Sequence, residues 1–280
     1  MKRLALSLVS LTGLASTAAA QGDCFPPDES NEARTMAIFD VPLAFSGAAS
    51  PVVEPAGRIR VGLEGVYLPN VDDATSTPTI CRPGKGPEDT DLLFAAVRPR
   101  ASISLPGRFA FEASWIPPVR LNGVKANLFG FALSRATPLG GSGTTLGLRA
   151  HASVGTINAP ITCDTEALQD PASECYLGTR SDDSFKPNVF GIEAALSWAL
   201  GTRIRPYVGV GYNHLEPRFR VNFRNQAGDV DRRRVTVDLD RGVLFAGATV
   251  TVGSLELGGE IYSAPADAVT GRAIGRLRLR

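Results

Sequence analysis

Hydrophobic and polar residues alternate with a period of two along much of this chain, and residues 190–212 show the pattern most clearly. From Phe190 to Leu200 every second residue is apolar, and Glu193 falls on the opposite face. After a short break at 201–203 the alternation resumes and continues to Tyr212. A period of two is typical of a β-strand with one apolar face, and the short break predicts an antiparallel hairpin.

The same alternation recurs along the chain in about ten segments. Most have about the 9–11 residues that a tilted strand needs to cross a bilayer. After Gly242 two sets of apolar residues compete for one face, which favours a β-bulge there. The predicted strands are Arg58–Leu68, Leu92–Leu105, Arg108–Ile116, Val124–Ala136, Thr144–Gly155, Phe190–Leu200, a pair between Ile204 and Val252 that continues outward as a charged ribbon, Leu255–Tyr262 and Val269–Arg280.

The connections between these strands are tight and long in turn. Tight turns are expected at 106–107, 138–143, 201–203 and 253–254. Together with an even number of strands, this order predicts an all-β fold: a closed antiparallel transmembrane β-barrel of about ten strands. The tight turns would be periplasmic, the longer loops extracellular, and both chain ends periplasmic. A soluble sandwich would also alternate, but it has no reason to sort its connections by length.

The first 56 residues lie outside the predicted barrel. Residues 1–20 have the form of a secretory signal: basic Lys2 and Arg3, an apolar middle, and small residues at 18–20. That middle is too short to span a bilayer as a helix, which needs about 20 residues. Residues 21–56 are expected to form either a periplasmic arm or a segment that plugs the lumen, and residues 57–280 the barrel.

The strand pattern resembles that of the bacterial outer-membrane β-barrel domain superfamily, the small eight- to ten-stranded barrels. The resemblance covers about residues 57–280 and depends on runs such as Arg58–Gly65 and Arg205–Tyr212. It implies a location in the cell outer membrane and contact with outer-membrane lipid and lipopolysaccharide. It also implies insertion by the outer-membrane assembly machinery and a monomeric state. It implies no activity, because these runs are architectural.

Composition narrows the chemistry. The net charge of +1 becomes −1 without Lys2 and Arg3, so nothing points to nucleic acid. Of the four cysteines, Cys163 and Cys175 share one polar segment and form the natural disulfide, which leaves Cys24 and Cys81 as a second pair. A Cys24–Cys81 bridge would require the lumen-plugging alternative. The cysteine and histidine spacing predicts no metal site, and no cofactor is expected.

Charged residues gather on the face predicted to line the lumen. Burial requires such charges to be paired or hydrated. Two interpretations remain open: an ion-paired lumen that fills a narrow barrel, or a water-filled path whose excess arginine favours small anions. The predicted lumen residues are Arg60, Glu64, Arg98, Arg100, Glu112, Arg149, Glu193, Arg205, Glu256, Glu260, Arg272, Arg276 and Arg278.

Enzyme interpretations have weaker support, and no catalytic residue is assigned. His151 and Ser153 share one strand face, as a base and a nucleophile would, with a spacing similar to that of outer-membrane lipid A deacylases. No orienting carboxylate can be identified for them, and two polar residues on a polar face are the ordinary explanation.

Two surface features allow other roles. His214 with Asp238 and Asp240 invites comparison with ten-stranded outer-membrane proteases, but a solvated rim explains these residues as well. Residues 232–234, three arginines, could grip lipopolysaccharide phosphates or form an ordinary solvated cluster. We therefore expect a structural or surface-interaction role or passive passage of small solutes, with porin-like anion transport and lipid A modification or proteolysis as alternatives.

Overall fold

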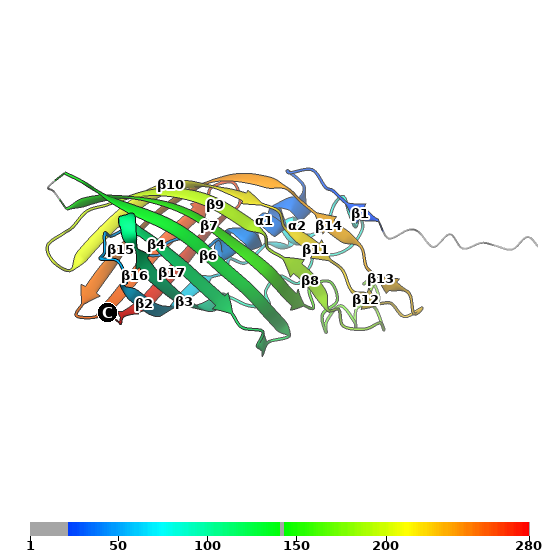
Figure 1. Cartoon of the computed structure of the whole chain (residues 1–280). Coiled ribbons are helices and arrows are strands. Elements are labelled where there is room, and N and C mark those ends of the chain that lie inside the picture. The colour runs from blue at the N-terminus through cyan, green and yellow to red at the C-terminus, as the bar shows by residue number, and fades with distance from the viewer. Residues whose placement is uncertain (1–21, 141–142, 280) are drawn as a thin grey trace, which may run out of the picture.

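The protein is a closed barrel of ten antiparallel strands (Figure 1), as the sequence predicts. The computed structural model describes residues 22–140 and 143–279, so the predicted signal segment lies outside the described residues. The ring closes where β17 pairs with β2, from Arg272↔Val66 to Arg278↔Arg60. The barrel strands are β2 (Ile59–Tyr67), β3 (Ala95–Leu105), β4 (Phe109–Ile116), β6 (Val124–Leu139), β7 (Thr144–Ala159), β9 (Val189–Ser197), β10 (Ile204–Leu215), β15 (Leu239–Val252), β16 (Leu255–Ala264) and β17 (Ala268–Arg278).

The apolar face of each strand points outward. Leu63, Ile192 and Ile261 are 58–63% exposed, whereas the neighbouring residues Glu64 and Tyr262 are buried inside the barrel. A closed barrel satisfies its backbone groups between strands, and such an apolar outer wall belongs in lipid. The chain is therefore a transmembrane β-barrel protein.

The two rims of the barrel differ. At one end, here called the turn rim, β3 and β4 are joined by a 3₁₀ turn, η1 (Pro106–Arg108), and β15 and β16 by residues 253–254. Gly107 and Gly253 have positive φ there (76° and 61°), which glycine adopts without strain. The opposite end, the loop rim, carries segments 68–94, 117–123, 160–188 and 216–238, with only 265–267 short.

Small strands extend the wall beyond the loop rim. The end of β7 pairs with β8, and the ladder continues through β11 and β14 to β1. The Cys163–Cys175 disulfide packs with Val221 and Phe223 beneath this extension. These elements are β1 (Asp23–Cys24), β5 (Arg120–Leu121), β8 (Asp183–Lys186), β11 (Arg218–Arg220), β12 (Phe223–Arg224), β13 (Val230–Asp231) and β14 (Arg234–Thr236).

The described chain starts and ends at opposite rims, which corrects the expectation that both ends lie on the turn side. β1 pairs with β14 at the loop rim, whereas β17 ends at the turn rim (Figure 1). Between them the chain enters the lumen as helix α1 (Asn31–Leu43) and continues without regular structure to β2. Residues 31–54 are called the plug below.

The loop-rim end of the plug is held by a disulfide and by packing of α1 against the 68–94 loop. Cys24 is disulfide-bonded to Cys81 in the 68–94 loop, whose short helix α2 (Asp73–Ser76) contacts α1. Ser30 caps α1, its hydroxyl oxygen accepting from the Ala33 amide at 3.1 Å. Neither helix of the described chain has the length and apolar composition to cross a bilayer.

Two local predictions were wrong. β15 contains no bulge: its register with β10 is continuous from Leu239 to Val250. Both apolar sets are used, Leu244 facing outward while Val243 and Phe245 are buried in the lumen. Strand β3 begins at Ala95 rather than Leu92, because the preceding residues belong to the loop over α1.

Candidate functional site

The turn-rim half of the lumen is filled by an ion-pair network. Glu64, fully buried, accepts from Arg98 and Arg100, each at 2.7 Å, and Glu112 joins Arg100 (2.7 Å) to Arg149 (2.6 Å). The other pairs are Arg272 with Glu64 and Glu260 (each 3.8 Å), Arg149 with Glu193 (4.0 Å), Arg276 and Arg278 with Glu256, and Arg60 and Arg278 with Glu54 of the plug.

The plug contributes backbone acceptors to this network. Arg98 donates to the carbonyl of Ala44 (3.1 Å), Arg100 to that of Ser46 (3.0 Å) and Arg272 to that of Ala44 (2.6 Å). The ring of Phe45 lies beneath three guanidinium groups, those of Arg98, Arg100 and Arg149, at 4.2–5.0 Å from the ring centre. The extended part of the plug is therefore an integral part of the lumen packing.

Lumen-facing glycines leave room for the plug. A Cβ on Gly130 would approach the Phe45 ring to 2.9 Å, and one on Gly147 would approach Pro51 to 2.5 Å. Only a residue without a side chain allows such contact, so the wall and the plug have matching shapes.

Arg205 was wrongly predicted to belong to the network. It lies at the turn rim and donates to the carbonyl of Gly143 at 3.1 Å; within residues 22–140 and 143–279 no carboxylate is found to pair with it. Strand parity places its side chain on the lumen face, but the register places it at the end of β10, where solvent replaces a buried partner.

The predicted polar pair on β7 is enclosed within the lumen. Ser153 donates to the Leu43 carbonyl at 2.8 Å, and His151 lies 3.4 Å from Glu193. No carboxylate beside His151 could be identified from the sequence, and the structure shows one, because β9 brings Glu193 next to it. All three side chains are buried, and the serine hydroxyl is committed to the plug, so the geometry provides no access for a lipid substrate.

The predicted rim residues do meet at the loop rim. Nδ1 of His214 is 2.9 Å from Asp240, and Nε2 is 3.6 Å from Asp238 and 3.2 Å from Glu216. The carboxylates of Asp238 and Asp240 are largely exposed and that of Glu216 is partly exposed, as expected of a solvated rim. No group of histidine, cysteine and acidic residues in the described part of the chain is arranged to hold a metal ion.

The arginines at 232–234 are partly neutralised within the protein. Arg233 pairs with Asp231 at 2.5 Å, and Arg234 is 4.0 Å from Asp23. These contacts reduce the charge available for lipopolysaccharide phosphates.

The loop-rim half of the lumen is apolar. Helix α1 packs its Met36 and Val41 into a core that includes Val189, Leu215 and Leu239 at the loop-rim ends of their strands. Phe39, on the same helix, meets Phe185 of β8 edge to face, with ring centres 6.3 Å apart. Sequence periodicity could not assign these residues to one core, because they come from a helix and from distant strands.

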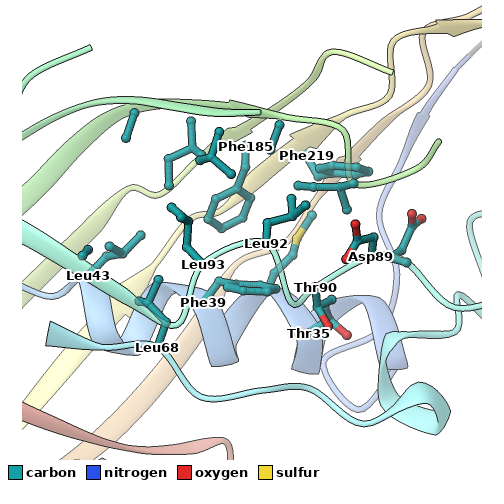
Figure 2. Close-up of a pocket in the computed structure, with 18 of the residues that line it drawn as sticks. Thr35, Phe39, Leu43, Leu68, Asp89, Thr90, Leu92, Leu93, Phe185 and Phe219 are labelled. Atoms are coloured by element: carbon teal, nitrogen blue, oxygen red, sulfur yellow. The ribbon is translucent and has the colours of Figure 1, made fainter. Parts of the chain in front are cut away.

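Beside α1 lies a cavity of about 450 Å³, here called the loop-rim cavity. Most of its wall is apolar, and it is bounded by α1, the 68–94 loop and the loop-rim ends of β3, β4, β6 and β7. Figure 2 shows Phe39, Leu92, Leu93 and Phe185 around it, with Thr35, Asp89 and Thr90 gathered at one end. A cavity of this size, lined in this way, is typical of a site for a small organic molecule.

Acidic residues stabilise the loop that forms this cavity. Glu32 of α1 accepts from the amides of Thr79 (3.0 Å), Ile80 (2.7 Å) and Cys81 (2.8 Å). Burial opposes its ionisation, but the amides of Cys81 and Ile80 outweigh burial and lower the pKa of Glu32. Partial burial raises the pKa of Asp89, at the polar end of the cavity.

The cavity was not predicted from the sequence. The available signals were the apolar patch Met36–Phe39 within a segment otherwise rich in polar residues, and the paired Leu92 and Leu93. The first was assigned to an arm or plug of unspecified structure and the second to a strand. Only the threading of the plug through the barrel brings the two patches together.

Among known proteins the chain matches solved structures only. No protein-family model and no curated protein matches the chain. Ail, the attachment invasion locus protein of Yersinia pestis, is 10% identical over 80% of this chain and 98% of its own, with a TM-score of 0.31. The P. putida toluene transporter TodX is 12% identical over 83% and 70%, with a TM-score of 0.33. Omp33 of Acinetobacter baumannii is 9% identical over 80% and 99%, with a TM-score of 0.28. Values this low carry no argument about the function of this chain.

Proposed function

We propose that this protein is an outer-membrane receptor or carrier for a small apolar molecule, which it holds in the loop-rim cavity. The observation that carries the proposal is the contrast in the lumen. Its charged half retains a cavity of only about 90 Å³, whereas its apolar half encloses about 450 Å³. Burial of apolar ligand surface in such a space supplies about 25 cal/mol per Å². The ligand would be mostly apolar with at most one polar group, directed toward Thr35, Asp89 and Thr90.

The proposal is tested with a probe whose fluorescence rises in apolar surroundings, N-phenyl-1-naphthylamine. Protein in lipid nanodiscs should bind it saturably above the background of empty nanodiscs. Leu93→Trp fills the cavity, so we expect the affinity to fall about tenfold, equivalent to ~1.4 kcal/mol. Phe94→Trp is the matched control, because Phe94 is adjacent but 77% exposed and does not line the cavity. Equal affinities in the two variants, or no saturable binding, would refute the proposal.

Passive passage of anions is the alternative, and the packing of the lumen supports it less. The arginines that would attract anions are engaged by carboxylates and by plug carbonyls, and the second cavity, among them, measures only about 90 Å³. We therefore expect no stepwise current when the protein is inserted into planar bilayers. Regular, anion-selective current steps from the unmodified protein would instead support passive passage of anions.

A further inference from the structure

The hydrogen-bonded wall of the barrel is interrupted near the loop rim. The pairing of β3 with β2 continues to Tyr67↔Ala95, but its pairing with β4 stops at Arg100↔Ser114. Among the described residues, 95–99 therefore have a strand neighbour on one side only. We call this interruption the β3–β4 seam; its sides are Ala95–Pro99 and Ile116–Leu121.

Proline explains why the ladder stops. If the register continued, Pro99 would lie opposite Trp115, and Pro117 and Pro118 would lie opposite Val97 and Ala96. Proline has no amide hydrogen to donate, and in an antiparallel ladder only every second residue bonds to a given neighbour, so Pro99 and Pro117 cannot form their bonds across the seam. Backbone groups without hydrogen-bond partners are costly in a bilayer, so an open strand edge is tolerated only where it is buried in protein or lines a cavity.

The loop-rim cavity extends through the seam. Its lining includes both Ala96, on the lumen face of β3, and Val97, on the outer face and 58% exposed. From the other side it is lined by Pro117, Val119 and Leu121, the last two 59% and 61% exposed. The cavity thus wraps around the free edge of β3 and reaches the outer surface of the barrel.

The mouth lies where the barrel meets the membrane interface. Trp115 and Phe129 stack beside it on the outer wall, with ring centres 6.3 Å apart, and aromatic residues concentrate at that depth in transmembrane barrels. The seam residues that line the cavity carry no charge, and they favour an apolar molecule that is already dissolved in lipid.

We propose that the β3–β4 seam is a lateral entrance through which an apolar ligand passes between the bilayer and the loop-rim cavity. This inference rests on the proposed function and specifies the ligand class as membrane-partitioned molecules. A soluble molecule would instead have to enter between the loops, where Leu92, Phe185 and Phe219 bound the cavity.

The test closes the seam and leaves the cavity in place. A Val97→Cys/Val119→Cys variant, bridged with a bifunctional thiol reagent, is compared with a Phe111→Cys/Leu133→Cys variant bridged in the same way. Phe111 and Leu133 are outward-facing partners on strands that are already paired. The four native cysteines are all in disulfides, so the reagent addresses the new pairs. N-phenyl-1-naphthylamine is delivered in lipid vesicles, and its binding and release are followed in time.

Relative to the same variant before bridging, a bridged seam should slow both binding and release about tenfold or more, and the control bridge should alter neither rate. Unchanged rates at a bridged seam would overturn the lateral entrance but leave the cavity as a binding site. Absence of saturable binding in the unbridged protein would instead overturn the proposed function and the entrance with it. If bridging disturbs folding, Val97→Trp, which narrows the mouth, is compared with Val208→Trp on β10. The same slowing is expected for the former only.

Discussion

The two halves of the lumen differ in what fills them. Toward the turn rim, guanidinium and carboxylate groups surround Phe45, and the carbonyls of the extended plug complete their hydrogen bonds. Toward the loop rim the same segment is a helix with largely apolar side chains, and the arginines of the network reach only carbonyls of its last turn, those of Val41 and Leu43. An extended plug segment suits a charged wall and a helical one suits an apolar wall, because most carbonyls of a helix are used within it.

This difference also explains where space is left. Charged groups must be packed closely to satisfy one another, and an unfilled gap among them is costly. Apolar walls tolerate a void at the lower cost of lost dispersion contacts. The cavity of about 450 Å³ is accordingly in the apolar half, which links lumen polarity to the proposed binding site.

The largest effect on the charged half of the lumen is expected from replacing Glu64, the acceptor shared by Arg98 and Arg100. Glu64→Gln should lower the free energy of unfolding by about 3–5 kcal/mol, because two buried guanidinium groups lose their ionised partner. Urea unfolding in lipid vesicles, followed by tryptophan fluorescence, measures the change. Glu216→Gln, at the partly exposed rim, is the control and should cost at most about 0.5 kcal/mol. If Glu64→Gln left the free energy of unfolding unchanged, the turn-rim half would be hydrated rather than packed.

Removal of either disulfide should have an intermediate effect on the free energy of unfolding, and the two losses can be compared. Cys24–Cys81 closes a separation of 57 residues and Cys163–Cys175 one of 12. From loop entropy, replacing the first pair with serine should cost about 4 kcal/mol and replacing the second about 3 kcal/mol. Cys81 lines the loop-rim cavity, so only the first variant should also weaken probe binding. Equal loss of binding in both variants would show that the loops act as one unit.

The smallest expected effect concerns the contact between α1 and the 68–94 loop. The amides of Cys81 and Ile80 lower the pKa of Glu32 below the usual 4.5, so the ionised carboxylate stabilises the folded state. This contribution is complete above the usual pKa and is lost as the pH falls through the lowered value. Glu32→Gln should cost about 2 kcal/mol at pH 7 and progressively less at acid pH. Unfolding free energies at several pH values measure it, with exposed Glu29→Gln as the control; a pH-independent cost would show that charge is not involved.

The local alternation of side chains was sufficient to predict the barrel. Each strand from β2 to β17 carries its own period of two, and tight turns such as 253–254 follow from residues adjacent in the chain. Because outward and inward positions alternate strictly, the lumen face followed as well; Arg205 lies on that face but at the turn-rim end of β10, outside the ion-pair network. The bulge predicted in β15 was wrong because the prediction assumed a uniformly polar lumen, whereas Phe245 packs against the rings of Tyr207 and Tyr262 inside the barrel.

The sequence by itself thus determined a transmembrane barrel with an apolar outer face and a charged inner face, because apolar and polar side chains alternate every two residues. Only the tertiary structure decided that residues 31–54 thread the lumen, that Glu193 meets His151, and that α1 and Leu92–Leu93 enclose a cavity beside a stretch of β3 that is paired on one side only. These contacts join residues far apart in the chain. The periodicity of one segment does not predict which distant segment will pack against it.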